Sequence, residues 1–136
     1  MLTQNSKFQT LNPKQYQNKN NQNSKRYDLE ERTYFFAKNI RDYVKKLPKS
    51  LSNFEYSKQL IRSSGSIAAN YIEANESLSR KDFFMRIKIS RKEAKETRLW
   101  LNLTEPLEQN IKEKDKLIQE SIEITKIFGS IVEKNK

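Results

Sequence analysis

The spacing of apolar and small residues constrains the fold of this chain more than any other feature. From Tyr27 onward these residues recur in steps of three and four, which places them on one side of an α-helix. The first such segment ends at Pro48, because proline cannot continue a helix. Its inward positions are Leu29, Thr33, Phe36, Ile40, Tyr43 and Leu47.

Three further segments have helical spacing. Ser52 followed by Glu55 resembles a capping box that opens the second helix, and Ser79 followed by Asp82 resembles one that opens the third. Pro106 marks the next connection. The inward positions are Leu60, Ile61, Ser64, Ala68, Tyr71 and Ile72 in the second helix, Phe83, Ile87, Ser90, Ala94, Thr97 and Leu101 in the third, and Leu117, Ser121, Ile124, Phe128 and Ile131 in the fourth.

These four segments predict an all-α fold, an antiparallel up-and-down four-helix bundle over residues 27–136. Residues 1–26 differ, since they hold eleven Asn or Gln, five Lys or Arg and no acid, without a sustained apolar period. This composition predicts a disordered basic arm. The arm carries +5 of the net charge of +10 and either contacts nucleic acid or is an uninvolved tail.

The composition excludes several classes of function. With no Cys and no His, the chain has no disulfide, no common zinc site and no Cys/His or Ser/His/Asp nucleophile. Two glycines in 136 residues leave no glycine-rich phosphate loop. No apolar run approaches the length of a membrane span and the N-terminus lacks a signal-peptide core, so we expect a cytoplasmic protein with no membrane partner.

Two of the predicted helices have more than one face suited to packing. Opposite its main apolar face, the second helix carries a small and polar set: Arg62, Ser66, Ala69, Asn70 and Glu73. The third helix has a second set with apolar and acidic members: Met85, Ile89, Glu93, Glu96 and Trp100. A helix in a single bundle needs one apolar stripe, so the second stripe predicts either a homo-oligomer interface or wider burial within the bundle.

A third side of the same helix carries only bases among its charged residues. They are Arg80, Lys81, Lys88, Arg91, Lys92, Lys95 and Arg98. Solvated helix faces usually mix charges of both signs, so this segregation favours contact with the phosphates of RNA or DNA, with a plain solvated face as the alternative.

Paired carboxylates are the one group of residues in the sequence that is compatible with acid–base catalysis. Glu73, Glu93 and Glu96 are expected to be half-buried, but we expect Glu93 and Glu96 to pair with Arg62 or Arg86 or to bond Asn70 or Ser66 at a helix contact. We therefore predict a protein that is not an enzyme and that uses no cofactor, metal or small-molecule substrate.

Two ordered blocks add a resemblance to a known family. Residues 59–77, QLIRSSGSIAANYIEANES, resemble the motif QLxRSxxSIxANxxEA, and residues 82–101, DFFMRIKISRKEAKETRLWL, resemble DFxxKxxIxxKEAxETxYWL. Both motifs belong to the bacterial four-helix-bundle proteins named after the intervening sequences of large-subunit ribosomal RNA genes. The matching positions are Arg62, Ser63, Ser66, Ile67, Ala69, Asn70, Glu73 and Ala74, then Lys92, Glu93, Ala94, Glu96, Thr97, Trp100 and Leu101. Leu99 and Thr104 depart from the pattern.

The resemblance implies a homopentamer. A relative of this fold, the accessory protein of diversity-generating retroelements, is also a basic pentamer and binds nucleic acid. The leading hypothesis is therefore an oligomeric nucleic-acid-binding accessory factor. The alternative is an oligomeric protein-interaction scaffold that does not bind nucleic acid.

Overall fold

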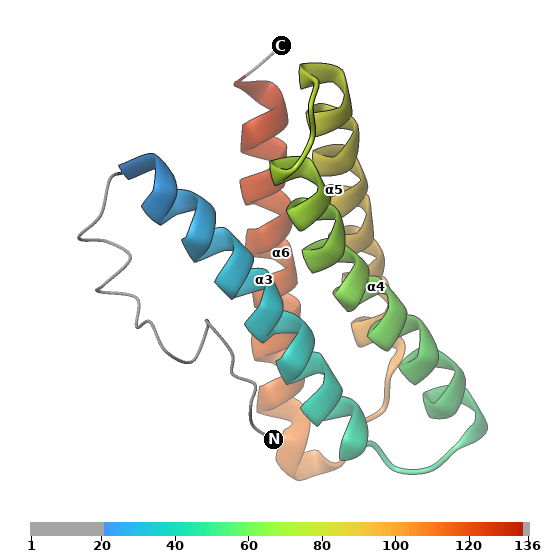
Figure 1. Cartoon of the computed structure of the whole chain (residues 1–136). Coiled ribbons are helices and arrows are strands. Elements are labelled where there is room, and N and C mark those ends of the chain that lie inside the picture. The colour runs from blue at the N-terminus through green and yellow to red at the C-terminus, as the bar shows by residue number, and fades with distance from the viewer. Residues whose placement is uncertain (1–20, 135–136) are drawn as a thin grey trace, which may run out of the picture. The chain divides into compact units, whose positions relative to one another are not determined.

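The computed structural model describes residues 21–134 of the chain, with side chains from Leu29 onward (Figure 1). Its long elements are α3 (Asn21–Lys45), α4 (Leu51–Asn75), α5 (Arg80–Leu103) and α6 (Ile111–Glu133), and the short 3-10 helix η2 (Glu108–Asn110) precedes α6. This described part contains no strand. The predicted all-α fold is confirmed, and the packed helices are consistent with a four-helix bundle.

Two boundaries lie near the start of the chain: the structure describes residues from Asn21 on, and a compact unit begins at Thr33. Residues 1–20, most of the predicted basic arm, lie outside the described residues, and α3 begins at Asn21 rather than at Tyr27. Residues 33–136 form a compact unit that carries most of the core. Within this unit, α4 packs against α5 and α5 packs against α6.

Serine caps precede α4 and α5, although the cap of α4 lies two residues from the predicted position. The Ser79 hydroxyl accepts a hydrogen bond from the Asp82 backbone N–H at 3.1 Å, as the sequence predicts for α5. The prediction of Ser52 as the cap of α4 was wrong. Ser50 has the extended backbone of an N-cap and accepts from the Asn53 N–H at 3.1 Å, which places Ser52 inside the first turn.

The predicted core positions of α5 and α6 are largely confirmed. The buried members are Ile87, Ser90, Ala94, Thr97 and Leu101 on α5 and Leu117, Ser121, Ile124 and Phe128 on α6. Near the end of α6 the buried position differs by one residue from the prediction: Val132 is buried, and Ile131 is only half-buried. Thr33, Phe36, Ile40 and Tyr43 of α3 are also buried, as predicted.

The inward face of α4 differs from the prediction. Ile61 and Ile72 were expected in the core, yet 46% and 49% of their surfaces are exposed. Ser63 and Ile67 are fully buried in their place. Ser63 is accommodated because its hydroxyl shares a 2.7 Å hydrogen bond with the Thr97 hydroxyl of α5, which satisfies a buried polar group.

Asn53 joins two connections at one end of the bundle. Its buried amide nitrogen donates to the carbonyl oxygens of Pro48 and Glu105, each at 3.0 Å. Its carbonyl oxygen accepts from the Glu105 N–H at 2.9 Å. A single side chain therefore fixes the α3–α4 connection against the segment that follows α5.

Stability at high pH is expected to depend on Tyr43. Its buried hydroxyl lies 2.7 Å from the Thr104 hydroxyl. Burial is the main cause that raises the Tyr43 pKa above its ordinary value of 10.0, although the bond to Thr104 opposes this effect. Above about pH 10 the unfolded chain releases this proton more readily than the folded chain does, so the free energy of unfolding falls as pH rises.

Tyr43→Phe is the variant that tests this dependence. It should cost about 1 kcal/mol at neutral pH, through the lost hydrogen bond. Between pH 8 and pH 11, urea denaturation should show this difference shrinking, because only the wild-type chain carries the ionisable group at this position. A difference that stays constant across the series would contradict the prediction.

Candidate nucleic-acid interface

The basic stripe of α5 is the first candidate site, and it consists of the seven predicted bases: Arg80, Lys81, Lys88, Arg91, Lys92, Lys95 and Arg98. All are exposed except Arg91, which is half-buried. A Cβ added at Gly129 of α6 would lie 3.9 Å from the Arg91 Cδ. The aliphatic part of Arg91 therefore lies near α6, a common arrangement for long basic side chains whose charged group stays in water.

Most of the stripe lacks a partner carboxylate. Among the described residues, Lys81, Lys88, Lys95 and Arg98 form no ion pair with an acid. Lys92 reaches only a marginal 3.9 Å from the Glu93 carboxylate. Lys88, Arg91, Lys95 and Arg98 follow one another in steps of three and four, so they share a side over about 15 Å of helix. This side presents positive charge that no acid in the structurally described range neutralises.

The acids of α5 lie toward α4 instead. One nitrogen of the Arg62 guanidinium lies 3.2 Å from the Glu93 carboxylate and 3.3 Å from the Glu96 carboxylate. The Glu93 side chain is only 7% exposed, whereas Arg62 is half-exposed. This pairing satisfies a buried carboxylate, so the role that the geometry gives these three residues is to hold α4 against α5.

A second polar contact joins the same helices farther along. The Arg86 guanidinium donates to the Asn70 carbonyl oxygen at 3.1 Å. The Asn70 amide in turn donates to the Ser66 hydroxyl at 3.0 Å and to the Ser66 carbonyl at 2.9 Å. Arg62, Asn70, Glu93 and Glu96 thus make contacts between helices of one chain, while Ala69 lies exposed.

The structure does not bring the three candidate carboxylates together. Glu73 was expected to be half-buried, but it is exposed. It lies eleven residues beyond Arg62, which is about 16 Å along α4, at a hollow lined by Glu73, Glu76, Ser77, Asp82, Met85 and Arg86. No group of three or more carboxylates in the described part of the chain could hold a metal ion.

The second apolar face of α5 remains partly uncovered. Met85 is 48% exposed, and Ile89 is half-buried. Trp100 is half-buried against Tyr56 of α4, with stacked rings whose centroids lie 6.1 Å apart. Its indole N–H is buried and has no hydrogen-bond partner among the described residues.

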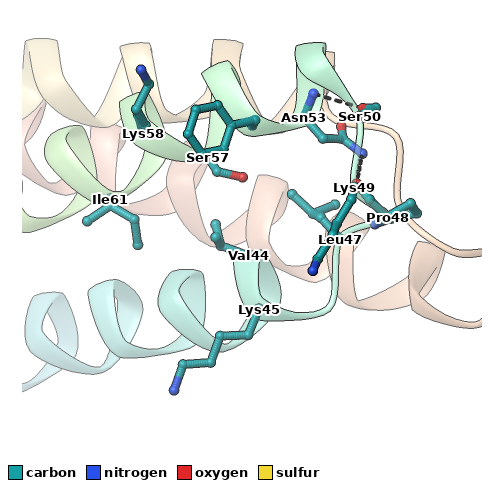
Figure 2. Close-up of a pocket in the computed structure, with 11 residues that line it drawn as sticks. Val44, Lys45, Leu47, Pro48, Lys49, Ser50, Asn53, Ser57, Lys58 and Ile61 are labelled. Atoms are coloured by element: carbon teal, nitrogen blue, oxygen red, sulfur yellow. Dashed lines mark hydrogen bonds between the residues drawn. The ribbon is translucent and has the colours of Figure 1, made fainter.

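A groove between the end of α3 and the first half of α4 was not predicted (Figure 2). It has a volume of about 740 Å³, and its apolar members include Val44, Leu47, Phe54 and Ile61. The groove was not predicted because Ile61, one of its lining residues, was wrongly assigned to the core. Phe54, which lines the groove, is 60% exposed, and hydrophobic spacing alone does not predict this exposure.

The fold and these surfaces define a basic, all-helical bundle protein, and no described helix is long and apolar enough to cross a membrane. A sequence profile described as 23S rRNA-intervening sequence protein matches residues 25–130. The chain belongs to this family, as the resemblance of its two motif blocks predicted.

A solved structure agrees with this assignment. The chain is 34% identical to a protein with unknown function from the S23 ribosomal protein family of Bacteroides thetaiotaomicron. The match covers 76% of this chain and 97% of that protein, with a TM-score of 0.66. A search of curated proteins finds no match.

Proposed function

We propose that this protein is a non-enzymatic, homo-oligomeric nucleic-acid-binding factor of the cytoplasm that contacts phosphates through the basic stripe of α5. The observation that carries the proposal is a set of exposed cations that have no partner acid within the described part of the chain: Lys81, Lys88, Lys95 and Arg98. Phosphate contacts release counterions, and this provides affinity without base-specific readout. RNA is the first ligand to test, because the family description names 23S rRNA.

Self-association forms the second part of the proposal. Large apolar side chains on the outer side of α5 remain exposed, including Met85 and Leu103 at 48% and 42%. Exposed apolar patches usually mark interfaces. The family resemblance implies five copies, and repetition of the stripe around an oligomer would extend the cationic surface.

Neutralising part of the stripe is expected to weaken binding and reduce its salt dependence. In Lys88→Gln/Lys95→Gln/Arg98→Gln, three phosphate contacts are lost. The plot of log affinity against log salt concentration should become shallower by about 2 to 3. At about 0.1 M salt this corresponds to roughly 100-fold weaker binding. Fluorescence anisotropy with a labelled single-stranded RNA and a duplex measures both quantities.

The matched control removes the same charge from α6. Lys112, Lys116 and Lys126 are exposed, and Lys112→Gln/Lys116→Gln/Lys126→Gln should leave the slope close to that of the wild type. An equal change in both triple variants would show that net charge, rather than the stripe, governs binding. Absence of binding by the wild type at low salt would contradict the proposal.

The alternative function is a protein-interaction scaffold, and the unpredicted groove beside α4 favours it. Phe54 and Ile61 leave an apolar surface there that the phosphate contacts proposed for α5 do not use. Unchanged salt dependence in the α5 variant, together with a protein ligand that remains bound after nuclease treatment, would favour this alternative.

A further inference from the structure

The groove between α3 and α4 combines an apolar floor with a basic rim. Figure 2 shows Val44 of α3 and Ile61 of α4 facing the space between the two helices. Phe54, another lining residue, is 60% exposed. The charged side chains that line the groove are all lysines, namely Lys45, Lys49 and Lys58, and of these Lys58 pairs with Glu55 at 3.4 Å. The groove is therefore suited to an apolar side chain flanked by carboxylates.

The hollow at the other end of α4 has the opposite character. Met85 is 48% exposed there, beside the carboxylates of Glu73, Glu76 and Asp82. The one cation in the lining, Arg86, donates to the neutral Asn70 amide at 3.1 Å and keeps its charge, so three acids against one base leave the lining acidic. The chain has a net charge of +10, so a cluster of three acids around an exposed methionine has the opposite sign to the chain as a whole. The two surfaces are complementary in charge, and each exposes a large apolar side chain.

One molecule cannot join these two surfaces to each other. Lys49 precedes α4 and Glu73 lies near its end, so the helix separates them by about 36 Å. We infer that the lysine-rimmed groove of one copy receives the acidic hollow and Met85 of a second copy. This inference rests on the self-association part of the proposed function and assigns the surfaces that meet.

The contact joins two different surfaces of the chain. Two copies arranged antiparallel make it twice, groove to hollow and hollow to groove, and close as a two-fold dimer. In any other orientation each copy that donates its hollow still has an open groove, and assembly continues until a ring closes or a filament grows. A two-fold dimer in which the same patch meets itself is not compatible with this arrangement.

Charge reversal on either surface should disrupt assembly. Lys45→Glu/Lys49→Glu changes the groove and Glu73→Lys/Glu76→Lys changes the hollow. Each pair places like charges opposite one another, and the apparent dissociation constant should rise about tenfold or more. Light scattering on nuclease-treated protein at several concentrations measures this. Assembly is then measured without nucleic acid, so its failure is distinguishable from failure of RNA binding.

Restoration by the combined variant is the decisive result. A chain that carries both reversed pairs has complementary surfaces again and should recover the wild-type mass. Lys116→Glu/Lys126→Glu on α6 serves as the control and should leave the mass unchanged. The reversed residues are exposed, and circular dichroism verifies that each variant stays helical. Glu73→Lys, Glu76→Lys and Lys49→Glu suit the dipole of α4, whereas Lys45→Glu places an acid in the last turn of α3 and opposes the dipole of that helix.

A variant without charge change tests the apolar half of the contact. Phe54→Ser should weaken assembly by about tenfold, since exposed aromatic side chains often dominate interfaces. The inference is overturned if the wild type is monomeric at every concentration. It is also overturned if neither reversal changes the mass, or if the single reversals dissociate the assembly but the combined variant stays dissociated. In the last case another segment or partner occupies the groove.

Discussion

Phe128→Ala is expected to lower the free energy of unfolding by about 3–5 kcal/mol, the typical effect of removing a buried phenylalanine. The Phe128 side chain of α6 is fully buried, and its ring meets Tyr71 of α4 edge to face, with centroids 5.6 Å apart. The substitution leaves a cavity and removes this aromatic contact between two helices. Urea denaturation followed by circular dichroism measures the change.

The control for this prediction is an exposed apolar residue. Leu78 lies in the α4–α5 connection and is fully exposed, so Leu78→Ala should change the free energy of unfolding by less than about 0.5 kcal/mol. All proteins are compared at one concentration, because assembly raises apparent stability. A loss below about 1.5 kcal/mol for Phe128→Ala would show that the cavity collapses or that Phe128 packs less tightly than the structure indicates.

Arg62→Ala is expected to cost roughly 2 kcal/mol, because Glu93 stays buried without its main partner. Loss of one member of a fully buried ion pair costs about 3–5 kcal/mol, and the half-exposure of Arg62 reduces this effect. The variant Glu93→Gln removes the charge that needs compensation. In that background, Arg62→Ala should cost less than about 1 kcal/mol.

This double-mutant cycle also tests the assignment of a structural role. If the two substitutions are additive in urea denaturation, Arg62 and Glu93 do not act as a pair in the folded protein. A result in which Arg62→Ala leaves stability unchanged but abolishes RNA binding would move Arg62 from the helix contact to the ligand surface.

Periodicity predicted the helices well, because each core position of α5 and α6 depends on spacing within one segment. It misplaced part of the inward face of α4, where the choice between Ile61 and Ser63 depends on another helix. Burial of Ser63 is favourable only because Thr97 lies 2.7 Å away. Ranking by hydrophobicity alone cannot include a hydrogen-bond partner 34 residues along the chain.

The two candidate surfaces differ in how far the sequence could reveal them. The basic stripe lies on a single helix, so a fixed rotation per residue was enough to separate Lys88 and Lys95 from Glu93. The groove is formed by parts of two helices and their connection. Its position depends on bonds such as those from Asn53 to Pro48 and Glu105, which no single helical segment specifies.

The stacking of Trp100 on Tyr56 gives the protein an intrinsic optical signal. Trp100 is the chain's single tryptophan, so the whole indole emission comes from one place, the contact between α4 and α5. Separation of these helices exposes the indole to water and shifts its emission to longer wavelength. Unfolding of this particular contact can therefore be followed without an attached dye, and compared with loss of helix across the whole chain in the same sample.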